Sequence, residues 1–311
     1  MITVSAISGG LALSLFFLAF QYGIHDQVIN DAVQIQSGHI TLEHKEYRDA
    51  PAVDLRIRVK DKVRNELVAM PGVVSAKAVV QGQGVAKSGS GAVGVAVMGV
   101  EASRENGVSP ISLNLIDGAY LADSDQRKIV VGSKLAEQLK LKVGKKLVLS
   151  SNDVNGELVE ELFRVKGIFE MHSPEMDGHL IQISLKAAQQ FFGLRLEDYT
   201  QLGIVLEDRR EQASLIERLQ GWGALEQSAE AMAILPWEEV LADLAALLEV
   251  DRAGNWFMLL ILVFLSLFTI WNTILMSVLE RTREFAMMLA LGTSPGLIRA
   301  QVLMESLIVG A

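Results

Sequence analysis

The densest group of side chains that could bind a metal or transfer a proton is a short segment with two imidazoles and two carboxylates, namely His172, Glu175, Asp177 and His179. A helical zinc protease site places two histidines four residues apart on one helix face, with a glutamate as general base. Here the histidines are seven residues apart, and Pro174 and Gly178 interrupt the segment. We therefore interpret it as a polar loop and not as a metal centre.

No other arrangement of reactive side chains matches a catalytic motif. The remaining histidines, His25, His39 and His44, lie apart from that segment, and no Gly-x-Ser-x-Gly nucleophile elbow is present. A Ser-His-Asp triad is defined by its geometry, so residues scattered along a sequence do not establish one. We expect a non-catalytic chain without a metal or cofactor site.

Glycines are concentrated in residues 81–100, where a nucleotide-binding loop would be sought first. A P-loop needs Gly-Lys-Ser or Gly-Lys-Thr at the start of a helix, so that backbone N–H groups and the lysine surround the phosphates. The only comparable pair, Lys87-Ser88, lacks the preceding glycine. We interpret the segment as a flexible hairpin between strands, and any ATP must be hydrolysed by another polypeptide.

Two long runs without a charged residue, 1–24 and 256–279, are the elements around which the rest of the chain is arranged. Each would form a helix of about 36 Å, enough to cross a hydrocarbon core of roughly 30 Å. A cleaved signal peptide would have a basic first segment and a small-x-small cleavage site, and residues 1–24 have neither. The sequence therefore predicts two transmembrane helices.

Residues 25–255, between the two runs, are typical of a water-exposed domain. Outside them the charged residues are only Glu280, Arg281, Arg283, Glu284, Arg299 and Glu305, so the formal net charge of −9 belongs to the domain. An acidic domain argues against nucleic-acid binding, because phosphate contacts need a basic surface. The chain has no cysteine, which excludes disulfides but fits either side of a membrane.

The short loops indicate the orientation. Arg281, Arg283 and Arg299 follow the second run closely, whereas residues 25–40 contain neither lysine nor arginine. The positive-inside rule then places residues 280–299 in the cytoplasm and the domain outside. Residues 300–311 begin another apolar segment, about 18 Å long as a helix and too short to cross. We expect the start of a truncated third transmembrane helix there, and an earlier natural start upstream of Met1.

Amphipathic patterns extend both predicted transmembrane helices toward the domain. Apolar residues from Ile24 to Ile35 recur at helical spacing, which predicts that the first helix continues outward. Pro236 can begin a helix with one apolar stripe, formed by Val240, Leu241, Leu244, Leu247 and Leu248. The two extensions could pack against one another or each against the domain, and the sequence leaves both possibilities open.

Polar residues inside the second run share one face or lie beside it: Ser266, Thr269, Asn272, Thr273 and Ser277. Polar groups in lipid favour contacts with other helices, at about 0.6–2 kcal/mol each. We expect this face to pack against a neighbouring transmembrane helix. A substrate path is the less favoured interpretation, because none of these residues is charged.

Within the domain, the alternation from Val53 to Val59 predicts a strand with one exposed face. A helix over 61–70 and a strand over 73–80 would complete a βαβ unit. Asn155-Gly156 is a hairpin signal. Further strands are predicted over 162–169 and 202–206, and helices over 185–192 and 208–219. These patterns predict an α+β domain with a mixed sheet.

Several segments resemble ABC-transporter permeases of the MacB, LolC/LolE and FtsX type. One is Ser-Val-Leu-Glu-Arg-Thr-Arg-Glu at 277–284, followed by Ala290-Leu291-Gly292 and Glu305. Others are 36–42 with 47–51, and 129–136 with 141–149, which in that family form a strand, a short helix, a glycine turn at Gly144 and a strand. Lys145 departs from the family, which often has an acidic residue there.

This resemblance implies a membrane protein of the bacterial inner membrane, with several transmembrane helices flanking an α+β extracytoplasmic domain of the MacB-like periplasmic core type. It also implies that the segment after the second transmembrane helix is a coupling helix that docks on a separate ATP-binding subunit. The residues that would make this contact are the polar Glu280, Arg281, Arg283 and Glu284, the apolar Phe285, Met288 and Leu289, and the helix stop Gly292.

The further partners implied are a second permease chain, identical or related, membrane lipid, and a lipoprotein or other periplasmic partner. ATP-driven closure would push on residues 280–291 and move the outer domain, for lipoprotein release or export of a hydrophobic substrate. From its chemistry alone, the short helix could instead anchor to lipid headgroups. The alternatives are a two-span sensory receptor with a ligand-binding outer domain and an FtsX-like regulator of a cell-wall hydrolase.

Overall fold

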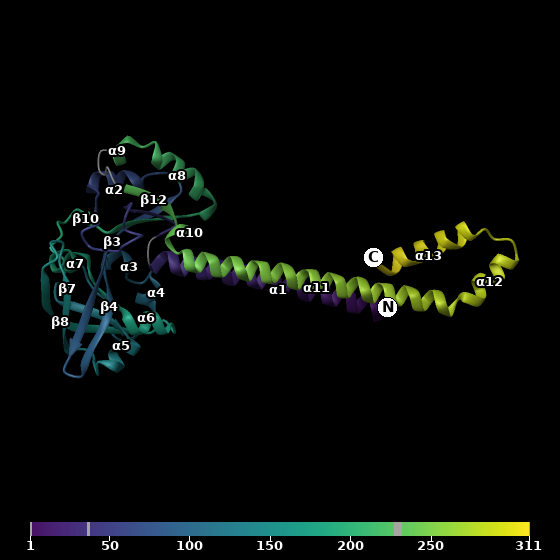
Figure 1. Cartoon of the computed structure of the whole chain (residues 1–311), viewed down its shortest axis with the longest axis horizontal. Helices are drawn as coiled ribbons and strands as arrows, with labels where there is room; N and C mark the ends of the chain where they lie inside the picture. Colours follow the sequence, from purple (N-terminus) through teal and green to yellow (C-terminus); the bar gives the residue numbers. More distant parts are fainter. Residues whose placement is uncertain (1, 36–37, 227–231, 311) are drawn as a thin grey trace. The chain divides into compact units, whose positions relative to one another are not determined.

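The computed structural model describes residues 2–35, 38–226 and 232–310 (Figure 1). Residues 36 and 37, at the start of one segment with a family resemblance, lie outside this part of the chain. The chain divides into two compact units. One comprises residues 1–27 and 243–311 and is helical, and the other comprises residues 28–242 and contains all the strands.

Long helices make up the first unit: α1 (Ile2–Ile35), which ends in the second unit, α11 (Ala242–Glu280), α12 (Thr282–Ala290) and α13 (Pro295–Gly310). The predicted continuation of the first helix beyond residue 24 is confirmed as helix. The single helix predicted from Pro236 is wrong. A short helix α10 (Trp237–Val240) is separated from α11 by Leu241, whose φ of −112° and ψ of 53° are not helical.

Among the described residues, α11 is the helix whose length and apolar composition would allow it to cross a membrane. Its apolar side chains are exposed in the structure, with Trp256 72% and Phe264 65% accessible. Such exposure of large apolar groups over a whole helix is typical of a surface that meets lipid or another helix. The transmembrane role of residues 1–24, which lie in α1, stays a prediction.

Among the described residues of the second unit, ten strands form one mixed sheet in the order β12-β1-β11-β3-β4-β9-β6-β8-β5, with β7 pairing β3 and β8. The strands are β1 (Ile40–His44), β3 (Val73–Ser88), β4 (Gly91–Val100), β5 (Leu115–Gly118), β6 (Lys128–Gly132), β7 (Lys146–Asn152), β8 (Leu158–Phe169), β9 (Leu180–Ser184), β11 (Gln201–Leu206) and β12 (Met232–Pro236). Pairs β4–β9 and β6–β8 are parallel and the others are antiparallel, so the predicted α+β class and mixed sheet are confirmed.

Six of these strands close into a ring. The pairings run β3–β4, β4–β9, β9–β6, β6–β8, β8–β7 and β7–β3, which leaves no free edge in this part of the sheet. Alternate residues on its strands point to one face and form a buried core, for example Ile129 and Val131 on β6 and Phe163 and Val165 on β8.

A second core lies under β1 and β11. There Leu42 and Leu202 pack with Leu67 of α2 and Leu215 of α8. Besides α10 and the end of α1, the described part of the domain contains the helices α2 (Asp61–Val68), α3 (Ala102–Glu105), α4 (Pro110–Leu113), α5 (Ser133–Gln138), α6 (Pro174–His179), α7 (Leu185–Phe191), η1 (Arg209–Glu211), α8 (Gln212–Gln220) and α9 (Gly223–Glu226). The helices predicted over 61–70, 185–192 and 208–219 are therefore confirmed, with shorter bounds or a 3₁₀ start.

The strand predicted from Val53 to Val59 is wrong in extent. Only β2 (Ile57–Arg58) forms, and it pairs with β10 (Asp198–Tyr199) in a separate two-stranded sheet. Two charged residues of the alternating pattern, Arg56 and Arg58, pair with the Asp198 carboxylate at 3.2 and 2.7 Å. Because β2 and β3 belong to different sheets, the expected βαβ unit does not form.

The glycine-rich segment forms a hairpin, as predicted. Its arms belong to the paired strands β3 and β4, in register from Val79↔Val100 to Ser88↔Gly91, so it is regular strand up to the turn. Helix α7 approaches the strands closely, since a Cβ at Gly99 would lie 2.2 Å from the Ala188 Cβ. The predicted turns are confirmed, with φ of +87° at Gly144 and +79° at Gly156.

Candidate functional site

The segment after α11 has well-defined helix boundaries. Helix α11 ends at Glu280, and α12 begins at Thr282. Arg281 between them has a φ of −98° and a ψ of 13°, which are not helical. At the other end Gly292 has a φ of +90°, its N–H donates to the Leu289 carbonyl at 3.1 Å, and the Thr293 N–H donates to the Met288 carbonyl at 3.0 Å. These two bonds form a Schellman motif, which satisfies carbonyls at the helix end. The predicted stop at Gly292 is confirmed, and α13 begins at Pro295 as expected.

The side chains of α12 give it two kinds of surface. Glu280, Arg281, Arg283 and Glu284 are exposed at its start. Phe285 and Met288 are half-buried, and Leu289 is exposed, and these three share one face by their spacing. A short helix with exposed charges next to an apolar face is suited to docking on a partner or lying at a membrane surface. The docking roles of these residues stay predictions.

The polar face of α11 makes contacts within its own helix. The Thr269 hydroxyl donates to the Leu265 carbonyl at 2.9 Å, and the Thr273 hydroxyl donates to the Thr269 carbonyl at 2.9 Å. The remaining residues predicted on this face, Ser266, Asn272 and Ser277, are half-buried or exposed. Hydrogen bonds back to the helix satisfy the hydroxyls in an apolar environment. Packing of this face against another helix stays a prediction.

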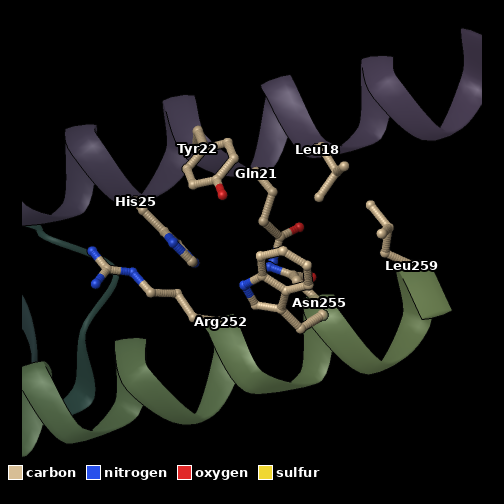
Figure 2. Close-up of a pocket in the computed structure, with 8 residues that line it drawn as sticks. Leu18, Gln21, Tyr22, His25, Arg252, Asn255 and Leu259 are labelled. Carbon is tan, nitrogen blue, oxygen red and sulfur yellow. The ribbon is translucent and has the colours of Figure 1, made fainter.

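A polar cluster that the sequence reasoning did not identify lies between α1 and α11 (Figure 2). The buried His25 ring places Nε2 2.5 Å from the Asp251 Oδ2, and the Gln21 side-chain amide donates to the same oxygen at 2.9 Å. His25 and Asp251 lie just beyond the uncharged stretches of their helices, and Gln21 lies in the last turn of the first stretch. A charged or titratable residue within two helical turns of an uncharged stretch is the only sequence signal that could have indicated this cluster.

A hollow of about 380 Å³ adjoins this cluster, within the helical unit. Its lining changes from polar to apolar along the helices, and comprises Leu18, Gln21, Tyr22, His25, Arg252, Asn255, Trp256 and Leu259 (Figure 2). Tyrosine, tryptophan and arginine are the residues that concentrate where a membrane meets water. A membrane boundary near residues 22 and 256 stays a prediction.

The histidines considered for catalysis make separate contacts. His179 Nδ1 lies 2.8 Å from the Gly94 carbonyl, and the Asp177 Oδ1 accepts the Met171 N–H at 2.7 Å. The buried His39 accepts the Leu206 N–H at its Nδ1, at 3.1 Å. Burial lowers the pKa of His39, Arg209 lowers it further, and Glu238 opposes them. In the described ranges no three histidines or carboxylates are grouped so that they could hold a metal ion.

Comparison with known proteins gives two family matches. Residues 1–221 match the MacB-like periplasmic core domain, and residues 256–311 match the FtsX-like permease C-terminal domain. Together the matches cover most of the domain as well as α11 to α13.

Two solved structures are similar to parts of this chain at low sequence identity. The extracellular domain of the noncanonical ABC-type transporter YknZ from Gram-positive bacteria is 18% identical, with 63% of this chain and 98% of that chain covered and a TM-score of 0.45. The periplasmic region of MacB from Actinobacillus actinomycetemcomitans is 13% identical, with 66% and 92% covered and a TM-score of 0.45.

Proposed function

Because this chain belongs to the family of MacB-like and FtsX-like ABC transporter permeases, we propose that it is the membrane subunit of a transporter whose ATP is hydrolysed on a separate subunit. In this proposal α12 is the coupling helix in the cytoplasm, and α1, α11 and α13 contribute to a multi-pass membrane domain. The domain of residues 28–242 lies in the periplasm, or outside the cell.

The observation that carries this proposal is the geometry of α12. A long apolar helix breaks at Arg281, and a nine-residue helix follows that ends in a Schellman motif at Gly292. A rigid helix with a fixed stop can transmit a push, whereas a frayed segment would absorb it. Any ATP-driven effect also requires that the ATP-bound partner favour one arrangement of the permease over another by a differential free energy.

We further propose two permease chains, identical or related, bound to two ATP-binding subunits. The cargo that the family favours is a lipoprotein or another hydrophobic molecule, and movement of the outer domain would release or export it. Control of a cell-wall hydrolase is the second form that this proposal can take, because residues 256–311 match the FtsX-like C-terminal domain. A two-span receptor has no support from that match.

Charge reversal at the start of α12 tests the proposal. The double substitution R281E and R283E should lower permease-stimulated ATP hydrolysis at least about tenfold, since repulsion and lost ion pairs at an interface together reach several kcal/mol. Membrane insertion should be unchanged. The measurement is ATP hydrolysis by the ATP-binding subunit reconstituted with the permease in nanodiscs.

A matched control reverses two exposed basic residues of the domain, K140E and K142E, and should leave the stimulation unchanged. Since the chain has no cysteine, a single R283C variant can also be labelled in intact cells. Protection from a membrane-impermeant maleimide is expected. Labelling from outside, or full stimulation in the double variant, would contradict the proposal.

A further inference from the structure

The chain enters and leaves the domain on neighbouring strands. Helix α1 ends at Ile35 and β1 begins at Ile40, while β12 ends at Pro236 directly before α10. Strands β1 and β12 pair antiparallel, with Ile40 opposite Pro236, and the Trp237 N–H donates to the His39 carbonyl at 3.0 Å. The two points of attachment therefore lie side by side on the sheet.

Arg48 binds the end of the departing helix to β1. Its Nε and Nη2 donate to the two Glu43 carboxylate oxygens at 2.7 and 3.1 Å, and its Nη1 donates to the Val240 carbonyl at 2.6 Å. The Glu43 side chain is fully buried on β1, and its Oε2 also accepts a bond from the Gln201 amide of β11 at 2.8 Å. One planar guanidinium thus joins β1 to the last residue of α10.

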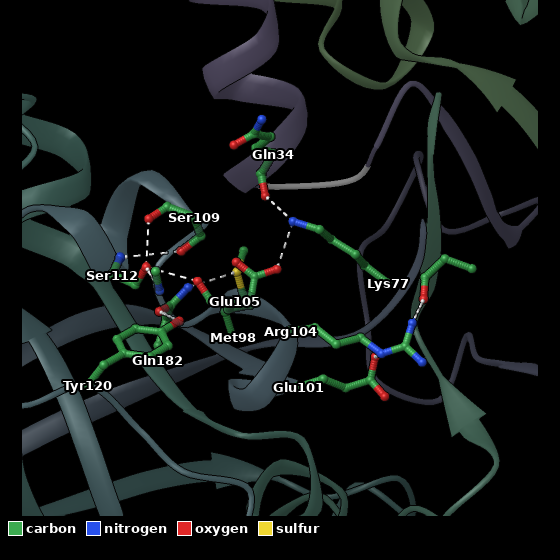
Figure 3. Close-up of polar contacts among 12 residues, drawn as sticks. Gln34, Lys77, Met98, Glu101, Arg104, Glu105, Ser109, Ser112, Tyr120 and Gln182 are labelled. Carbon is green, nitrogen blue, oxygen red and sulfur yellow. Dashed lines mark hydrogen bonds and ion pairs between the residues drawn. The ribbon is translucent and has the colours of Figure 1, made fainter. Parts of the chain in front are cut away.

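Lys77 makes the corresponding contact at the end of the entering helix (Figure 3). Its Nζ donates to the Gln34 carbonyl in the last turn of α1 at 3.2 Å, and it pairs with the Glu105 carboxylate at 2.9 Å. Both side chains of this pair are about nine-tenths buried. Lys77 lies on β3, opposite Gly203 of β11, so the contact ties α1 to the middle of the sheet.

Stability alone does not account for this arrangement. A buried ion pair is often no more favourable than well-packed apolar side chains of the same volume. Arg48 and Lys77 differ from an ordinary ion pair because each also binds a backbone carbonyl at the end of a helix. Such a carbonyl has no donor within its own helix. Each cation consequently fixes the position of a helix end relative to a strand, at the two places where the chain passes out of the domain.

We propose that Arg48 and Lys77 are positioning residues that lock the ends of α10 and α1 to the sheet, so that a displacement of either helix moves the domain as one body. The role of this locking in transmitting movement rests on the proposed function. The locking itself is a property of the domain and can be measured without an ATP-binding subunit.

The test uses spin labels on the whole protein in lipid nanodiscs, and residues 1–311 contain no cysteine that would compete for the labels. One label pair joins exposed positions on α1 and α2, as N30C with K62C, and the other joins α10 and α2, as E239C with K62C. Substitution R48K keeps the positive charge beside Glu43 but cannot form the three-way fork. The double substitution K77M and E105Q removes the other pair without leaving a buried charge unpaired.

We expect R48K to broaden the distance distribution of the α10 pair roughly twofold and to leave the α1 pair unchanged, because only the Val240 contact is lost. K77M with E105Q should do the reverse. The matched control is R56K, since Arg56 and Arg48 are both 35% accessible and each pairs with a carboxylate that is at most 2% accessible. Both distributions should stay narrow in R56K.

A second measurement adds the ATP-binding subunit and traps it with ATP and vanadate. In the unsubstituted protein both distances should stay constant on trapping, while in the two variants the distance at the released helix should shift. If both variants keep distributions as narrow as those of the parent, or if all variants including R56K broaden alike, the positioning role is wrong. Absence of any ATPase stimulation would instead contradict the proposed function and leave the first measurement valid.

Discussion

The domain and the helical unit use the same kinds of residue in opposite ways. In the domain, large apolar side chains such as Phe163 and Phe169 are fully buried, and the buried carboxylate of Asp198 pairs with a basic side chain. In α11, Trp256, Phe264 and Trp271 are mostly exposed, and polar hydroxyls bond to their own helix. The first region is therefore stabilised by burial from water, whereas these large apolar side chains of α11 gain little from burial among the described residues.

The largest expected effect comes from removing a buried aromatic ring of the domain. Phe163 is fully buried and meets Phe191 edge to face, with ring centroids 5.9 Å apart. F163A should lower the free energy of unfolding of the domain by about 3–5 kcal/mol, through lost transfer energy and a cavity. Hydrogen exchange of the β8 and β9 amides measures this change.

The matched substitution in the helical unit is F264A, at a ring that is 65% accessible. It should leave the exchange of the same β8 and β9 amides within about 0.5 kcal/mol of the parent. Equal losses of unfolding free energy in F163A and F264A would mean that burial from water stabilises both regions alike, and would contradict the difference between them.

Adding a methyl group should have opposite effects in the two regions. At Gly99 a Cβ would lie 2.2 Å from the Ala188 Cβ, so G99A should force strand β4 and α7 apart and cost about 1–3 kcal/mol. At Gly254, in the interior of α11, no atom lies within 4 Å of an added Cβ. G254A should therefore favour the helix by up to about 1 kcal/mol. Thermal melting of the two variants in detergent should give shifts of opposite sign.

The smallest effect concerns pH and is confined to the domain. Burial lowers the pKa of His39 in the folded state, so the unfolded chain takes up a proton first as the pH falls. Its contribution to stability is therefore complete above the ordinary histidine pKa of about 6.5 and is lost as the pH falls below it. Between pH 7.5 and 5.5 we expect a decrease of a few degrees in Tm that is smaller in H39Q.

The control for this measurement is H172Q, because His172 is exposed in the domain. It should keep the full pH dependence of the parent. A pH dependence that persists in H39Q and disappears in H172Q would show that His172, and not His39, causes the effect, and would contradict the prediction.

Features that depend on a few consecutive residues were predictable from the sequence. The glycine turns at Gly144 and Gly156 and the stop at Gly292 follow from the need for positive φ, and the structure has all three. The start of α13 follows in the same way from the proline at its first turn. The limits of α12, and so the location of the candidate coupling residues, were therefore accessible before the structure, although their roles were not.

Features that depend on pairing across long separations were not predictable. The alternation at Val53–Val59 indicated a strand. It gave no sign that Arg56 and Arg58 both contact Asp198, some 140 residues later. The contact of Arg48 with Val240 spans 192 positions and has no local signal at either end. The same holds for the closed ring of strands. His25 and Asp251, 226 positions apart, have no signal beyond their position near the uncharged stretches.

Strand β3 connects the three buried clusters of the domain. Its sixteen residues pair with β11, β4 and β7, and its side chains enter all three buried clusters, through Ala76, Val79 and Val80. A domain with such a common spine cannot lose one cluster while the others stay intact, so its slowest-exchanging amides should all be released in a single cooperative event. An extracytoplasmic part that opens only as a whole is also one that resists proteolytic nicking between its halves.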